Sequence, residues 1–252
     1  LVRGMNGDSE GLLRYFERVT ENDLSNHELV ADVARRLLQQ GKMDRALKLL
    51  DRVSARSDTP GELHALHGVA LTQAGRPADA LKAYLRAAEH PPVIVAVYQA
   101  VVRILAEDRR TSEALPLLAR ARNSFAAEPG PLLEIVDLYR VIGAADARLK
   151  SQTQAAALEV LAQVRALKPE DPSISLRLAD RYVQLGQAEQ CEAVLRELQE
   201  RAPRNPAALS RLAELYLRSG RIPEASRQLE ALRKIDPANP VTYYFLGVVA
   251  LQ

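Results

Sequence analysis

The sequence predicts an all-α protein built as a stack of helix pairs. The 252 residues are 47% hydrophobic and 26% charged but only 4% aromatic. Ala, Leu and Arg dominate, a composition that favours helices packed through small and aliphatic side chains. A glycine followed by a short polar turn recurs at Gly41, Gly75, Gly186 and Gly220, and a small residue follows each glycine five positions later. Such fixed spacing indicates repeated supersecondary units.

Alignment on these glycines divides the chain into successive units. Full units cover residues 27–60, 61–94, 95–128, 129–171, 172–205 and 206–239. All have 34 residues except the unit at 129–171. Residues 1–26 match the second helix of a preceding unit, with Leu12, Phe16 and Val19 on its apolar side, and residues 240–252 match a further first helix. Neither end has the polar cap of a finished helical stack, so we interpret the sequence as a segment of a longer protein.

Each position within a unit has a physical role. Small residues at the eighth and twentieth positions let the two helices approach closely, and larger residues at the seventh, eleventh and twenty-fourth positions fill the space beside that contact. The glycine at the fifteenth position is expected to end the first helix in the left-handed conformation. Pro77 and Pro223, just beyond such glycines, suit the first turn of the second helix.

The unit at 129–171 departs from this pattern. Its first helix is expected to end at Gly143, whereas Ala157, Leu161 and Val164 match its second helix, which leaves nine extra residues at about 144–152. These residues favour helix, so we expect an extended or kinked helix or a protruding loop. The insertion is interpreted either as a tolerated surface feature or as a projection that binds a partner.

The repeated unit resembles the tetratricopeptide repeat. The unit at 61–94 carries the resemblance best, with Gly68, Ala80, Tyr84, Ala87 and Pro92 at the eighth, twentieth, twenty-fourth, twenty-seventh and thirty-second positions. The tryptophan usual at the fourth position is replaced by Val30, His64, Tyr98, Leu132, Ser175, Leu209 and Tyr243. The resemblance implies a right-handed superhelical α-solenoid that binds another protein or a peptide in a concave groove.

The resemblance also implies which residues line that groove, on the inner face of the first helices. The expected groove residues are Arg35, Gln39, Gln99, Arg103, Leu133, Asp137, Arg140, Leu176, Asp180, Gln184, Glu214, Arg218 and Tyr244. Their charge changes from basic to acidic along the chain, which predicts a partner with basic and apolar surface at the C-terminal half. The alternative is that these residues are merely solvated. The Lys and Asn with which some relatives clamp a C-terminal carboxylate are absent from the fifth and ninth positions.

No catalytic, cofactor or metal site is predicted. The sequence contains no Gly-rich phosphate loop, nucleophile elbow or paired catalytic carboxylates. His64 and His67 form an H-x-x-H pair, but they occupy core-facing positions without further ligands at a suitable spacing, which favours packing over metal binding. Cys191 takes a small-residue position and is interpreted as a buried packing thiol.

Charge and hydropathy make two classes of partner poor candidates. The net charge is +2, from 34 basic and 32 acidic residues mixed along the chain, which is not the footprint of a nucleic-acid-binding protein. No apolar run approaches the ~18 residues of a membrane span. The last helix exposes apolar residues, namely Val241, Tyr244, Leu246, Val248 and Leu251, and predicts weak self-association.

The leading hypothesis is a non-catalytic scaffold that organises a multiprotein complex. The composition and the degenerate repeats suggest a bacterium. Long arrays resembling this one organise cell-envelope machines there, including exopolysaccharide synthesis and export, so the periplasm is preferred over the cytoplasm. The alternative is a regulatory or substrate-recruiting arm of a larger enzyme.

Overall fold

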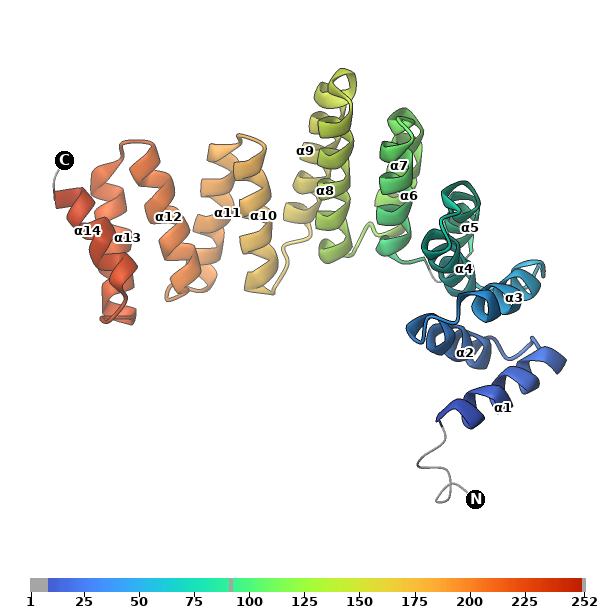
Figure 1. Cartoon of the computed structure of the whole chain (residues 1–252). Coiled ribbons are helices and arrows are strands. Elements are labelled where there is room, and N and C mark those ends of the chain that lie inside the picture. The colour runs from blue at the N-terminus through green and yellow to red at the C-terminus, as the bar shows by residue number, and fades with distance from the viewer. Residues whose placement is uncertain (1–8, 91–92, 251–252) are drawn as a thin grey trace. The chain divides into compact units, whose positions relative to one another are not determined.

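The computed structural model describes residues 9–90 and 93–250, and their regular secondary structure is entirely helical (Figure 1). The all-α class is therefore confirmed. The helices are α1 (Ser9–Asn22), α2 (His27–Gln39), α3 (Met43–Ser54), α4 (Gly61–Gln73), α5 (Pro77–Glu89), α6 (Val95–Glu107), α7 (Ala114–Ser124), α8 (Pro129–Ala145), α9 (Lys150–Ala166), α10 (Pro172–Gln184), α11 (Ala188–Arg201), α12 (Pro206–Arg218), α13 (Ile222–Ile235) and α14 (Pro240–Ala250), with short 3-10 segments η2 (Thr111–Glu113) and η3 (Ala147–Leu149). Pro92 and Leu251 lie outside the described residues, as do the side chains of Leu12 and Val241.

The chain divides into two compact units, residues 1–124 and 125–252. In the first unit α1 precedes the pairs α2/α3, α4/α5 and α6/α7. In the second unit the pairs α8/α9, α10/α11 and α12/α13 precede α14. The helices α2, α4, α6, α8, α10, α12 and α14 begin at the residues where the sequence units begin. The division into repeats stays a prediction.

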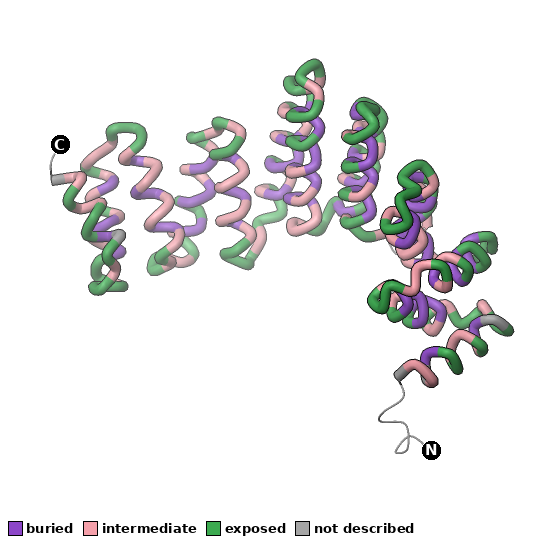
Figure 2. The backbone as a smooth tube through the Cα atoms, in the orientation of Figure 1, coloured by how far each residue is buried: buried purple, intermediate pink, exposed green. Residues whose placement is uncertain are grey.

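Small residues lie where the helices of a pair touch. Ala80, Cys191, Ala213 and Ala225 are at most 2% exposed, as the spacing predicted. A Cβ atom added to Gly68 would lie 2.6 Å from the ring of Tyr84, so that contact between α4 and α5 requires glycine. Figure 2 shows the buried residues along the sides of helices that face their neighbours, and the exposed residues at the turns.

Four glycine turns have the predicted left-handed backbone, with φ of 69° to 73° at Gly41, Gly75, Gly186 and Gly220. After Gly186, the Gln187 N–H donates to the Tyr182 carbonyl at 2.8 Å, which closes the end of α10. Arg109 takes the same position in the pair α6/α7 with a φ of 58°, and the Arg110 N–H donates to the Leu105 carbonyl at 2.7 Å. The turn therefore forms even where a side chain makes the left-handed backbone costly.

The prediction that Gly143 ends its helix is wrong, because α8 continues to Ala145. Gly143 is buried within the helix, and an added Cβ would lie 2.4 Å from Thr153 Oγ1 on α9. The glycine is needed here for close contact between two helices and not for a turn. Glycine occupies this position here as it does in most other repeats, but here it is required for space between helices and not for a left-handed turn.

The nine extra residues extend both helices of the pair. Helices α8 and α9 have 17 residues each, against 13 in α10 and 14 in α11. Of the outcomes expected from the sequence, the structure has the extended helix. None of the residues 144–152 is buried, so the added turns lie outside the core of the unit. Figure 1 shows the taller α8/α9 pair beside α10 and α11.

Candidate functional site

Four expected groove residues lie in the first unit, on α2 and α6. Arg35 contacts Asp32, with 2.6 Å between Nη1 and Oδ1, and it also pairs with Glu62 at the start of α4. Gln39, Gln99 and Arg103 are exposed. Arg35 thus links two consecutive first helices through a surface ion pair.

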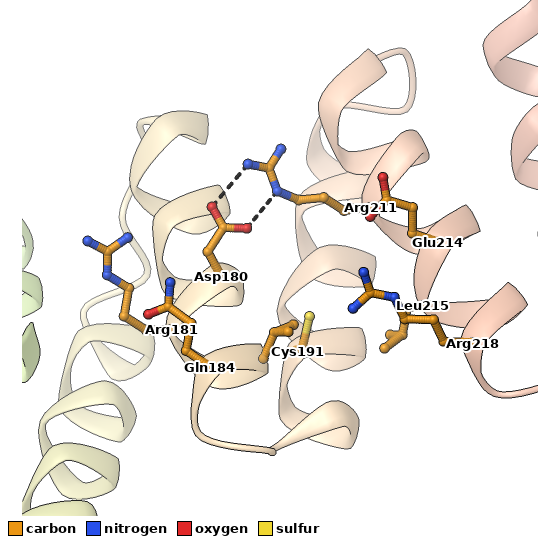
Figure 3. A pocket seen from close by; sticks show the side chains of 9 residues that line it. Asp180, Arg181, Gln184, Cys191, Arg211, Glu214, Leu215 and Arg218 are labelled. Carbon is orange, nitrogen blue, oxygen red and sulfur yellow. Dashed lines mark hydrogen bonds and ion pairs between the residues drawn. The ribbon is translucent and has the colours of Figure 1, made fainter. Parts of the chain in front are cut away.

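In the second unit, several expected residues surround one pocket between α10 and α12, with a volume of about 310 Å³ (Figure 3). Asp180 and Gln184 come from α10, and Glu214 and Arg218 come from α12. We call it the α10–α12 pocket. The sequence reasoning missed its other charged and apolar lining residues, Arg181, Val183, Arg211 and Leu215. Arg181 and Leu215 directly follow predicted groove residues, which is the signal that could have found them.

Asp180 and Arg211 form a two-pronged ion pair across this pocket. Arg211 Nε lies 2.8 Å from Asp180 Oδ1, and Nη2 lies 3.0 Å from Oδ2, as the dashed lines in Figure 3 show. This geometry matches the planar guanidinium to the carboxylate. The hydrogen bonds that Arg211 donates to Asp180 raise the pKa of Arg211 above its ordinary value. The pair fastens α10 to α12.

Asp137 on α8 is paired as well. Arg181 Nη2 lies 2.7 Å from Asp137 Oδ2, and Arg140 Nη1 lies 3.3 Å from Oδ1. The acidic groove residues are Asp137, Asp180 and Glu214. Two of these three carboxylates, those of Asp137 and Asp180, are therefore paired with an arginine on the next first helix, and Asp137 also with an arginine on its own helix. The acidic half of the groove stays a prediction, and at these two positions the carboxylate charge is already compensated by arginine.

Three other expected groove residues differ in exposure. Leu133 is fully buried in α8, so the prediction that its side chain lines the groove is wrong. Leu176 is partly buried on α10. Tyr244 on α14 is 68% exposed and stacks edge-on against Phe245, with 5.4 Å between ring centroids.

Cys191 extends from α11 into the floor of the α10–α12 pocket and is 2% exposed. Burial is the main cause that raises the pKa of this thiol, to about 11. A thiol that holds its proton so firmly is a weak nucleophile at neutral pH. The predicted burial of Cys191 is confirmed.

The two histidines of the H-x-x-H pair are held in the core of the first unit. His64 is 3% exposed, and burial lowers its pKa to about 4. His67 Nε2 lies 2.9 Å from Asp51 Oδ1, and burial lowers the pKa of His67 despite that carboxylate. His, Cys, Asp and Glu side chains form no group of three suited to a metal ion within residues 9–90 and 93–250.

A second pocket of about 600 Å³ lies where the α8/α9 pair extends past α10. Arg140, Gly143 and Ala144 line it from α8, Ala147 from η3, and Lys150, Thr153 and Gln154 from the start of α9. Gln184 and Leu185 complete it at the end of α10. We call it the step pocket. Gln184 lines both pockets, so they adjoin.

Comparison with known proteins agrees with this architecture. A family model described as tetratricopeptide repeat matches residues 149–204 and 196–244, and a second model of that description matches residues 32–94. The matches cover more than half of the 252 residues. No curated protein sequence matches the chain.

No helix in the described part of the chain is long and apolar enough to span a membrane.

Solved structures resemble the chain at low sequence identity. The C-terminal part of a TPR repeat-containing protein from Cytophaga hutchinsonii is 15% identical, with a TM-score of 0.59 over 93% of each chain. A thermophilic TPR protein from Thermus thermophilus is 22% identical, with a TM-score of 0.42 over 76% of this chain and 100% of that one. YrrB, a TPR protein with an unusual peptide-binding site, is 15% identical, with a TM-score of 0.44 over 77% and 96%. At this identity the first of these structures supports the fold alone.

Proposed function

The chain belongs to the tetratricopeptide repeat family, and from this premise we propose that it is a non-catalytic scaffold that binds a partner protein. Such repeats generally mediate protein–protein interaction. The proposed binding surface is the first-helix side of the second unit, centred on the α10–α12 pocket. The partner contributes an extended segment that lies along this surface.

The observation that supports this proposal is a set of unengaged side chains around the α10–α12 pocket. The side chains of Gln184, Glu214 and Arg218 make no hydrogen bond or ion pair with any residue that the structure describes, although Glu214 lies close enough to Arg211 to help raise its pKa. Val183 is 43% exposed beside them. An amide, an anion, a cation and an aliphatic side chain around one hollow supply the polar and apolar contacts of a peptide site.

The Asp180–Arg211 ion pair has a supporting role in this site. It holds α10 and α12 at a fixed separation, so the pocket exists before a partner arrives. Binding to a preformed site avoids the cost of ordering the helices upon association. Asp180 is thus a positioning residue, whereas Gln184, Glu214 and Arg218 contact the partner.

The proposed context is a multiprotein complex in a bacterium, and specifically the synthesis or export of envelope polysaccharide in or facing the periplasm. The Ala-, Leu- and Arg-rich composition supports a bacterial source. The envelope context is supported by the resemblance to long arrays of such repeats that organise cell-envelope machines. Identification of the bound partner tests it, because a transferase or an export component would support it and a cytoplasmic metabolic enzyme would contradict it.

Site-specific photo-crosslinking in the native host tests the binding surface. A photoreactive amino acid replaces Gln184 in one variant and the exposed Lys234 on α13 in a control variant. We expect one partner protein to crosslink at position 184 and not at position 234. That partner, once purified, should bind the chain that carries no photoreactive residue. Identical products at both positions, or binding that survives Gln184→Arg and Arg218→Glu together, would overturn the proposal.

A further inference from the structure

The insertion that lengthens the α8/α9 pair also creates the step pocket. Without the added turn of α8 and the start of α9, Ala144, Ala147 and Lys150 would not stand beside the end of α10. The pocket volume of about 600 Å³ falls within the range of small-ligand sites. Residues 144–152 therefore supply three of the nine lining residues, including the lysine.

The charge of the step pocket is of one sign. Arg140 and Lys150 are its only charged lining residues, and both are cations. Lys150 has no ion-pair partner in the described part of the chain. Arg140 is only loosely held, because its 3.3 Å contact is to Asp137, which Arg181 already binds at 2.7 Å. The pocket offers two positive charges to an incoming anion.

The neutral lining residues suit a small anion on a flexible chain. Gln154 and Gln184 supply amide donors, and the 3.5 Å contact of Gln154 Nε2 to the Leu185 carbonyl is long enough to be exchanged for a better acceptor. Ala144 and Ala147 are small and exposed, so they leave room for a ligand to approach the helix ends. Leu185 offers an apolar contact for the methylene groups of an acidic side chain.

Continuity between the pockets identifies the source of the anion. Gln184 forms part of both linings, so a segment in the α10–α12 pocket runs directly to the step pocket. Within the step pocket itself, one arginine and one lysine, Arg140 and Lys150, are available to the ligand. A singly charged carboxylate matches this supply better than a phosphoryl group of about two charges, which typically takes an arginine cluster.

We propose that the step pocket binds an aspartate or glutamate side chain within the partner segment that occupies the α10–α12 pocket. The inference rests on the proposed function and adds a sequence preference to it. Lys150 and Arg140 compensate the carboxylate charge, and Gln184 stays in contact with the segment on both sides. The nine-residue insertion is thereby a specificity element that the regular repeats lack.

An array of short synthetic peptides tests the inference with the full 252-residue chain. The peptides carry one fixed residue, Asp, Glu, Ala, Lys or phosphoserine, at each position in turn, with both free and amidated C-termini. We expect the wild-type chain to prefer Asp or Glu at one internal position regardless of the C-terminal group. The selected peptide should bind about tenfold more weakly to Arg140→Gln/Lys150→Glu, as the loss of a charged contact predicts.

Lys234→Glu is the control for the Lys150→Glu part of the variant, because it makes the same charge reversal on an exposed residue of the same unit. It should bind the selected peptide as the wild type does. Peptide binding without an acidic preference, a preference for phosphoserine, or equal weakening by Lys234→Glu would overturn the inference but leave the proposed function intact. No binding to any peptide, combined with crosslinking at neither position 184 nor 234, would instead remove the proposed function itself.

Discussion

Gly143 and Gly186 hold the same position in two consecutive helix pairs, but they have different structural roles. Gly186 lies in an open turn with a φ of 73°, and nothing lies within 4 Å of a Cβ added there. Gly143 lies inside α8, where an added Cβ would lie 2.4 Å from Thr153 Oγ1. One glycine supplies a backbone conformation, and the other supplies space between two helices. A repeat position therefore constrains residue size without revealing which physical need it meets.

The fourth position gives the same lesson across the two units. Ser175 is buried in α10, and its hydroxyl accepts a hydrogen bond from Arg201 Nη2 at 3.1 Å. His64 is equally buried in α4, yet its Nδ1 has no hydrogen-bond partner. One buried polar residue is satisfied and the other is not. Unsatisfied burial costs more, so His64 should carry the larger penalty.

The largest predicted effect is therefore a loss of stability in acid caused by His64. Its folded pKa of about 4 lies below the ordinary 6.5, so the unfolded chain takes up the proton first as the pH falls. Stability should fall from about pH 6.5 to pH 4, by on the order of 3 kcal/mol at most. Denaturant titrations at several pH values measure this. His64→Leu should flatten the dependence, and an unchanged slope would show that another group is responsible.

The next effect tests the crowding at Gly143. Gly143→Ala should destabilise by about 1–3 kcal/mol, because the new methyl group overlaps Thr153 and outweighs the gain in helix propensity. Gly143→Ala combined with Thr153→Ala should recover most of that loss in urea unfolding. If both variants are equally destabilised, the close contact does not explain this glycine.

Gly186→Ala should cost less, about 1–2 kcal/mol, and for the other reason. The methyl group meets no neighbour, but the left-handed backbone disfavours a side chain. Asn tolerates this backbone better than Ala, so Gly186→Asn should recover part of the stability. Equal melting temperatures for the Ala and Asn variants would argue against backbone strain.

The contrast between these glycines also shows how much of the fold and of the site the sequence predicts. The period located the helix pairs and the buried Ala80, Cys191 and Ala213, because small residues at fixed spacing have one packing consequence. It misplaced the end of α8 at Gly143, because two physical reasons lead to the same residue. The site was found in part. The sequence named Asp180, Gln184 and Arg218. The ion pair between Asp180 and Arg211 joins two consecutive helix pairs, and spacing within one repeat does not reveal such a contact.

The smallest effect concerns the Asp180–Arg211 ion pair, which joins the helix pairs α10/α11 and α12/α13. A double-mutant cycle of Asp180→Ala and Arg211→Ala should give a coupling energy of about 0.5–1 kcal/mol, since both side chains remain over a third exposed. Added salt should reduce it. The cycle of Asp137→Ala and Arg181→Ala, measured alongside, should give a similar or larger value, because Arg181 is less exposed. A coupling near zero in both cycles would mean that these pairs do not fix the helices.

Deletion of residues 144–152 tests the central claim most directly, because it joins Gly143 to Thr153 and restores the regular 34-residue unit. No deleted residue is buried. The account predicts that the shortened chain folds with nearly the same melting temperature, still binds peptides at the α10–α12 pocket, and loses the preference for an acidic residue. Peptide binding with that preference intact, measured by calorimetry on the deleted and complete chains, would contradict the assignment of the insertion to partner recognition.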